Sequence, residues 1–119
     1  MTVSTASSFY VDQVRDVTVM CFTVRYLTEQ NYDVVSEELL EFVSLVAADR
    51  PIRIVAELSA ISEVDELGLA MLQAFSDSIE GAGGTLVLCR VQTGVMAAIR
   101  RMGLRCEFSR TCGEAIWSF

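Results

Sequence analysis

Four acidic residues, Glu57, Glu63, Asp65 and Glu66, lie close together in the sequence and are its most conspicuous candidates for chemistry. Carboxylates grouped in this way can hold a hard cation, when several oxygens converge at roughly 2.0–2.6 Å, or can act as an acid/base pair. Glu57 is expected in a strand whose neighbours are buried, and Glu63 on a loop, so nothing forces the four to converge. We therefore expect no metal site and no catalytic residues.

The residue types that are missing narrow the chemistry further. The chain has no histidine, the commonest general base and metal ligand. It also has no lysine, because all nine basic residues are arginine, and this excludes Schiff-base chemistry and a phosphate-loop lysine. Only carboxylates and thiols remain as catalysts, so we expect a protein that is not an enzyme and uses no cofactor.

The four cysteines, Cys21, Cys89, Cys106 and Cys112, contain no C-x-x-C pair. Cys21 and Cys89 fall in predicted strands and are expected to pack as small hydrophobic side chains. Cys106 and Cys112 could form a disulfide or bind a metal, although no histidine is present to complete a common zinc site. Residues 1–8 are polar and lack basic residues, unlike a signal peptide, so we expect reduced thiols in a cytoplasmic protein.

Length and composition predict a single domain over residues 1–119. A chain of 119 residues can bury a core without disulfides, and 52% of its residues are hydrophobic. No apolar run approaches the roughly 20 residues that cross a bilayer, so no membrane contact is expected. The surplus of apolar residues instead favours an exposed apolar surface and a protein partner.

Charge is divided unevenly along the chain. Residues 1–83 hold fourteen acids and four arginines, whereas residues 84–119 hold two acids and five arginines. The net charge of −7 disfavours nucleic acid as a partner. The two regions are either two solvated faces of opposite sign or a bipolar surface that is suited to stacking copies of the chain or to steering a partner.

Strand and helix patterns alternate along the chain and predict an α/β fold. Two strands, 8–14 and 16–24, precede a helix that ends at Asp49-Arg50-Pro51 and has Asn31 as its N-cap. The elements expected after it are a strand at 52–58, a helix that closes at 80–81, a strand at 85–89, a helix at 93–102, an extended piece at 105–108 and a terminal helix at 112–117. This pattern predicts a mixed sheet of four to five strands with about four helices.

Four single residues near the C-terminus carry further expectations. Thr93 is the predicted N-cap of its helix, and Gly103 is the predicted left-handed C-cap. Trp117 and Phe119 are expected to pack in the core or as a lid over it. The alternative for these two is an exposed aromatic anchor for a partner.

The stretch 56–72 is the centre of this arrangement. It leaves a strand, passes through a polar loop and restarts as a helix with Asp65 where an N-cap is required. The helix carries apolar or small residues on one face, at Gly68, Leu72, Phe75 and Ile79. Because glycine costs a helix roughly 1 kcal/mol relative to alanine, we interpret Gly68 as room for a strand that passes close beneath.

These residues resemble the signature of the STAS domain, the fold of anti-sigma factor antagonists. That signature is a strand, a short loop and Asp-Ser-x-Gly opening a helix, and this chain has Val64-Asp65-Glu66-Leu67-Gly68-Leu69 there. Residues 82–88, Ala-Gly-Gly-Thr-Leu-Val-Leu, are similar to the family's turn before its next strand. The resemblance covers about residues 17–115 and implies a single STAS-like domain.

Glu66 is the main departure from the family. In the family, a partner kinase of the GHKL type, which is also the anti-sigma factor, phosphorylates the serine that follows the aspartate. Glu66 replaces that serine and carries one negative charge where a phosphate adds about two. The resemblance therefore implies that phosphorylation at position 66 does not switch this chain, which is either fixed in a crude imitation of the phosphorylated state or has left the switch altogether. Ser59 and Ser62, in the same loop, are alternative phosphoacceptors.

The resemblance implies docking to an anti-sigma serine kinase through the loop 59–68 and the helix that follows. The expected partner-binding residues are Ser59, Ser62, Asp65, Glu66, Leu67, Gly68 and Leu69. Two other functions stay open: a structural subunit that assembles with STAS copies, its own included, and a binder of a small ligand or nucleotide. No loop is rich enough in glycine to favour a nucleotide. Taken alone, Asp65 and Glu66 also fit an ordinary helix cap and first-turn acid.

Overall fold

The computed structural model describes residues 8–48 and 51–119. Its elements are β1 (Phe9–Val14), β2 (Val17–Phe22), β3 (Tyr26–Leu27), α1 (Tyr32–Val46), β4 (Arg53–Glu57), β5 (Glu63–Val64), α2 (Glu66–Gly81), β6 (Thr85–Cys89), α3 (Thr93–Met102), β7 (Glu107–Ser109) and α4 (Cys112–Trp117). Two sequence predictions, the N-terminal segment 1–8 and the helix end at 49–51, fall mainly on residues outside this description.

The strands form two sheets. Five of them make a mixed sheet in the order β1-β2-β4-β6-β7, in which β1 pairs with β2 as an antiparallel hairpin and the other neighbours are parallel. The short strands β3 and β5 pair in parallel as a second sheet. The predicted α/β fold, with a mixed sheet and four helices, is confirmed.

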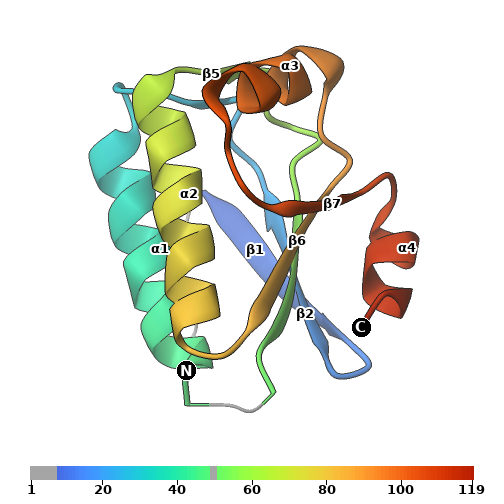
Figure 1. Cartoon of the computed structure of the whole chain (residues 1–119). Coiled ribbons are helices and arrows are strands. Elements are labelled where there is room, and N and C mark those ends of the chain that lie inside the picture. The colour runs from blue at the N-terminus through green and yellow to red at the C-terminus, as the bar shows by residue number, and fades with distance from the viewer. Residues whose placement is uncertain (1–7, 49–50) are drawn as a thin grey trace.

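Helices cover both faces of the large sheet (Figure 1). Helices α1 and α2 lie side by side on one face over the larger hydrophobic cluster, and α4 lies on the other face over a smaller one. The central strand β4 is buried on both faces, since Ile54 and Ala56 pack in the larger cluster and Val55 in the smaller. Such burial explains its continuous apolar sequence. Within the described residues, no helix combines the length and apolar character needed to cross a membrane.

Helix α2 passes almost in contact with the backbone of β3 at Gly68. A Cβ atom placed on Gly68 would lie 1.9 Å from the carbonyl oxygen of Leu27 and 2.6 Å from its carbonyl carbon. No side chain fits in that space, and a backbone carbonyl cannot turn aside as a flexible side chain would. The interpretation of Gly68 as room for a strand beneath the helix is therefore confirmed.

One predicted N-cap is confirmed in position only, and another is wrong. Asn31 stands at the cap position of α1 but makes no capping bond, because its side chain accepts from the Thr28 N–H at 3.0 Å and donates to the Tyr26 carbonyl at 2.8 Å. Thr93 is the first residue of α3, and Gln92 stands at the cap position instead. Gly103, with a φ of 74°, ends α3 in the left-handed conformation as predicted.

Two predictions about the C-terminal region also need correction. Cys106 packs with the larger cluster and Cys112 with the smaller, so they lie on opposite faces of the sheet and cannot bridge or share a metal. Trp117 is 71% exposed, with the Arg15 guanidinium 4.2 Å from its ring centre, and does not pack in the core. Phe119 is half-buried against the smaller cluster.

We expect Gly68→Ala to lower the free energy of unfolding by roughly 1–3 kcal/mol, because the added methyl group overpacks against the Leu27 carbonyl. Gly81→Ala is the matched control, since a Cβ at Gly81 meets no atom within 4 Å. The control should be neutral or slightly stabilising, as alanine is the better helix former. Urea unfolding of the three proteins measures both changes. Equal stability of the two variants would contradict the close approach.

Candidate partner-binding surface

The loops that follow the parallel strands meet at one end of the molecule, where the carboxyl ends of such strands commonly form binding sites. The loop after β4 is fastened on both sides. The Leu58 N–H donates to the Cys89 carbonyl at 3.1 Å, and the Ser62 N–H donates to the Arg25 carbonyl at 2.8 Å. The β3–β5 pairing continues this attachment, so the loop 59–65 is hydrogen-bonded to its neighbours on both sides.

Asp65 joins two segments through its carboxylate. One oxygen accepts the Gly68 N–H at 2.8 Å and caps α2, and the other accepts the Glu29 N–H at 2.9 Å from the loop after β3. These bonds favour the charged form, and they lower the pKa of Asp65, with the Gly68 bond contributing most and the Glu29 bond next. The predicted N-cap is thus confirmed, and its second bond connects the two loops.

Ser59 is held by Glu57. The Ser59 hydroxyl lies 2.8 Å from both carboxylate oxygens of Glu57, and the Ser59 N–H donates to the same carboxylate at 2.9 Å. Arg90 reaches Glu57 from the loop after β6, with 3.7 Å between Nε and Oε2. Gln92 donates to the Ser59 carbonyl at 2.7 Å. Ser59 therefore serves as an anchor for the turn, and its hydroxyl is already engaged.

The predicted partner-binding residues differ in exposure, and they fall into exposed, buried and half-buried groups. Ser62 and Glu66 are exposed, and Leu67 is 42% exposed at the start of α2. Gly68 and Leu69 are buried, so they support the exposed residues and present no side chain to a partner. Ser59 and Asp65 are half-buried and hold the loops in place.

Sequence reasoning missed the second loop of this surface. Tyr26, Glu29 and Gln30 are exposed beside the loop 59–65, because the β3–β5 pairing and the Asp65–Glu29 bond bring them there. A strand of two residues gives no periodicity from which to predict such a pairing. We call the exposed side chains of both loops the Asp65 surface. They are Tyr26, Glu29, Gln30, Ser62, Glu63, Glu66 and Leu67.

The described acidic residues are not grouped as a metal site requires. In the described part of the chain, no three Asp, Glu or Cys side chains come together as a metal site requires. Glu57 is engaged by Ser59 and Arg90, and both oxygens of Asp65 accept backbone N–H groups. The hydrogen bonds of Glu57 and Asp65 position the backbone of the loops.

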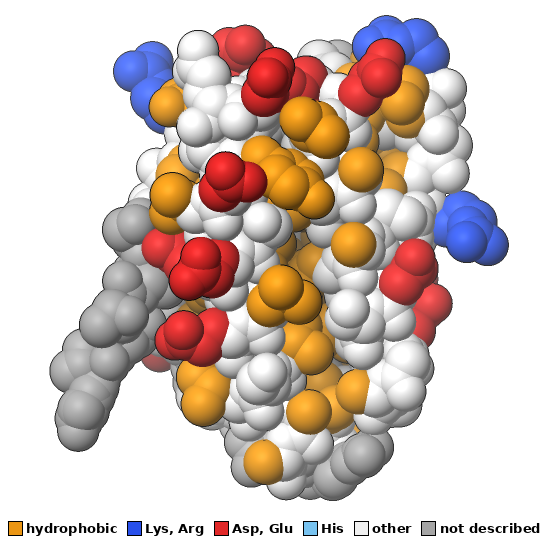
Figure 2. Space-filling model, turned by 90° about the vertical axis from the view of Figure 1, so that its left-hand side faces the viewer, with side chains coloured by type: hydrophobic (Ala, Val, Ile, Leu, Met, Phe, Trp, Pro, Cys, Tyr) orange, Lys and Arg blue, Asp and Glu red, His pale blue; other side chains and the backbone are white. Residues whose placement is uncertain are grey.

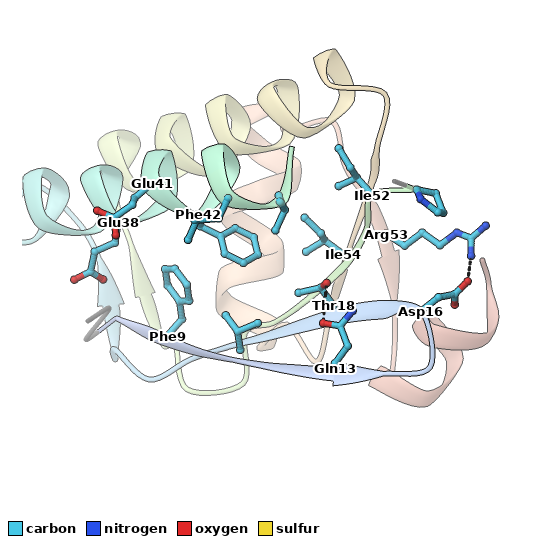
Figure 3. A pocket seen from close by; sticks show the side chains of 14 residues that line it. Phe9, Gln13, Asp16, Thr18, Glu38, Glu41, Phe42, Ile52, Arg53 and Ile54 are labelled. Atoms are coloured by element: carbon cyan, nitrogen blue, oxygen red, sulfur yellow. Dashed lines mark hydrogen bonds and ion pairs between the residues drawn. The ribbon is translucent and has the colours of Figure 1, made fainter. Parts of the chain in front are cut away.

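A separate hollow of about 400 Å³ lies between the β1–β2 hairpin and α1 (Figure 3). Its walls are apolar around Phe9 and Phe42, whose ring centres are 5.7 Å apart. Among the described residues that line it, Arg53 is the single basic side chain, and it is paired with Asp16. Glu38 and Glu41 add negative charge, so the hollow disfavours an anionic ligand such as a nucleotide.

Comparison with known proteins identifies the fold. The family model of the STAS domain matches residues 12–115. An anti-sigma-factor antagonist (STAS) domain protein from Planctomyces limnophilus is 17% identical with a TM-score of 0.77, and the match covers 92% of this chain and 96% of that one. A serine-to-glutamate variant of RsbS from Moorella thermoacetica is 23% identical with a TM-score of 0.75, with 94% of both chains covered.

A similar domain also occurs within a much longer protein. The murine anion transporter Solute Carrier 26 family member A9 is 16% identical with a TM-score of 0.73, over 90% of this chain and 18% of the transporter. No protein of curated function matches the sequence significantly. At these identities the similar structures indicate the fold alone.

We expect Asp65→Asn to destabilise the fold most near neutral pH. The lowered pKa means that the carboxylate stabilises the folded state above its unfolded pKa of about 3.9, and that this contribution is lost as the pH falls through the lower folded value. The stability difference between wild type and Asp65→Asn should therefore shrink in acid. Urea unfolding across pH, with the exposed Glu63→Gln as control, measures it. A difference that is constant with pH would contradict the role of the charge.

Proposed function

Because the chain belongs to the STAS domain family, we propose that it is a cytoplasmic anti-sigma factor antagonist that works by binding. Its partner is an anti-sigma factor with serine kinase activity of the GHKL type, and the Asp65 surface is the docking site. The observation that carries this proposal is the pair of bonds from Asp65, which fixes two exposed loops next to the position of the family's regulatory serine. A surface fixed before binding loses little conformational entropy on docking.

The composition of the surface supports a protein partner. Leu67 offers an apolar contact, and the exposed Glu29, Glu63 and Glu66 give the same surface negative charge. Such a surface favours a partner with an apolar pocket and basic residues near it. The absence of histidine and lysine from the sequence, together with the engaged carboxylates of Glu57 and Asp65, supports binding over catalysis.

Glu66 makes the docking constitutive in this proposal. It is exposed at the first turn of α2, where a negative charge is favourable, and it cannot accept a phosphate as a serine does. Ser59 is a poor substitute, because a phosphate on its hydroxyl would face the Glu57 carboxylate that now lies 2.8 Å away. Ser62 is exposed and is the more accessible hydroxyl.

Affinity capture from the native lysate tests the docking site. Wild type should retain a GHKL-type kinase, and the double variant Glu66→Arg, Leu67→Asp should reduce its capture about tenfold or more, because it reverses the charge and removes the apolar contact. Glu80→Arg, a charge reversal at the far end of α2, should bind as wild type does. Kinase capture by the double variant at the wild-type level would exclude this surface.

The captured kinase also tests whether phosphorylation at position 66 has been lost as a switch. With Mg-ATP, the variant Glu66→Ser should take up phosphate at position 66, whereas wild type should not be phosphorylated in the loop 59–68. Phosphate on Ser59 or Ser62 of the wild type would contradict constitutive docking.

A second candidate function is assembly with other STAS copies. An apolar groove between α1 and α2, flanked by acidic side chains, occupies the face shown in Figure 2, and Leu40 beside it is 66% exposed. The segments of α1 and α2 hold acidic residues and no arginine, whereas the exposed Arg100, Arg101 and Arg105 lie at or just after the end of α3. The two surfaces are complementary in charge, as a contact between successive copies requires.

Variants with reversed charges on α1 or α3 test whether copies of the chain assemble through these two surfaces. We expect wild type to show concentration-dependent sedimentation that weakens with salt. The double variants Glu37→Arg, Glu41→Arg and Arg100→Glu, Arg101→Glu should each remain monomeric, and an equal mixture of the two should associate again. A wild type that is monomeric at every concentration, or a mixture that stays monomeric, would exclude assembly through these faces.

A further inference from the structure

Two thiols meet on the side of the sheet opposite α1 and α2. Cys89 is the last residue of β6 and is buried, and Cys112 is the first residue of α4 and is half-buried. Their sulfur atoms are 2.8 Å apart. This distance is well inside the roughly 3.5–4.0 Å at which non-bonded heavy atoms pack best, and it approaches the bonded separation of about 2.05 Å.

The surroundings favour a bond between these two thiols over any other pairing. Cys106 packs in the hydrophobic cluster on the opposite face. Cys21 lies two strands away from Cys89, because the register aligns Cys21 with Glu57 on β4 and Glu57 with Cys89 on β6. Val55, Val87 and Ala115 surround the Cys89–Cys112 pair with apolar side chains.

We propose that Cys89 and Cys112 form a redox modification site, a reversible disulfide that fastens α4 to the end of β6. Neither residue belongs to the Asp65 surface, and this proposal does not rest on the proposed docking function. Disulfides in reducing compartments are commonly transient and redox-sensing, which fits a pair that begins as two free thiols.

The oxidant that we assign is a peroxide, and the half-buried Cys112 is the attacking group. Its thiolate attacks one oxygen of hydrogen peroxide, the O–O bond breaks, and hydroxide leaves and takes up a proton to become water. The Cys89 sulfur then attacks the sulfur of the Cys112 sulfenic acid, so that an S–S bond forms, the S–O bond breaks and a second water leaves with the Cys89 proton. Two thiols lose two electrons, and one peroxide is reduced to two waters.

The order of these steps follows from exposure. Burial raises the pKa of the Cys89 thiol, which keeps it protonated and makes it the poorer initial nucleophile. Cys112 is the more exposed residue of the two, so we assign the reaction with the oxidant to it. A dithiol reductant reverses the modification by thiol–disulfide exchange.

The disulfide would close a ring around α3 and β7, since Cys89 and Cys112 are 23 positions apart. Closing such a loop removes freedom from the unfolded chain and stabilises the fold. One end of the ring adjoins Arg90, which follows Cys89 directly and reaches Glu57. Oxidation therefore fixes α4 and the start of the segment that carries Arg90 and Gln92.

The test oxidises the full chain with hydrogen peroxide, blocks the remaining thiols with iodoacetamide and maps the peptides without reduction. We expect a peptide that links Cys89 to Cys112, the loss of two of the four free thiols, and a melting temperature raised by roughly 10 °C. Dithiothreitol should reverse all three changes. Cys106→Ser should still form the link, and Cys112→Ser should show neither the link nor the rise in melting temperature.

Three outcomes would overturn the proposal. They are alkylation of both Cys89 and Cys112 after oxidant treatment, a link of either residue to Cys21, Cys106 or another chain, and irreversible oxidation of Cys112 without a link. Cys89→Ala is the second probe, chosen because alanine leaves the buried position apolar. In that variant Cys112 should stop at sulfenic acid, which dimedone traps. The peptide map of the wild type decides the matter even where that variant fails to fold.

Discussion

One carboxylate holds together the part of the molecule on which our account depends. Asp65 accepts the Gly68 N–H within its own helix and the Glu29 N–H from a loop 36 positions earlier. The second bond is reachable because α2 touches the backbone of β3, and it can touch it only with glycine at position 68. The cap, the close approach and the β3–β5 pairing therefore support one another, and they fix the backbone from which the exposed side chains of the Asp65 surface project.

The attachment of the start of α2 by Asp65 also determines where Glu66 lies. A glutamate on a mobile loop would be one more surface charge, but here it stands on a helix start whose orientation is set by Asp65. Relative to a phosphorylated serine it offers less charge and fewer acceptor oxygens, so it holds one electrostatic state permanently. In the proposed function, a partner would meet a surface that is already formed, and binding energy would not be spent on ordering the loops. In the proposed function, the loss of a phosphorylation switch and the gain of constitutive docking are one change.

The sequence predicted those features that depend on neighbouring residues or on a long periodic pattern. The Asp65 cap, the need for glycine at 68 and the exact bounds of β6, α3 and α4 follow from residue types at set spacings. Contacts between distant segments could not be predicted in this way. The amide of Asn31 bonds back to the turn at 26–28, which no capping rule anticipates, and Cys112 meets Cys89 because α4 crosses to the far face. The position of Tyr26 and Glu29 on the Asp65 surface depends on β3, a strand too short to be predicted from the sequence.

The most direct test of the central claim is hydrogen exchange of the chain with and without its captured kinase. If the Asp65 surface is the docking site, binding should slow exchange in residues 25–31 and 59–69 and leave the far end of α2 and the α4 region unchanged. The two segments should be protected together, because one carboxylate ties them. Protection confined to α4, or to the groove between α1 and α2, would contradict the account and place the partner elsewhere on the molecule.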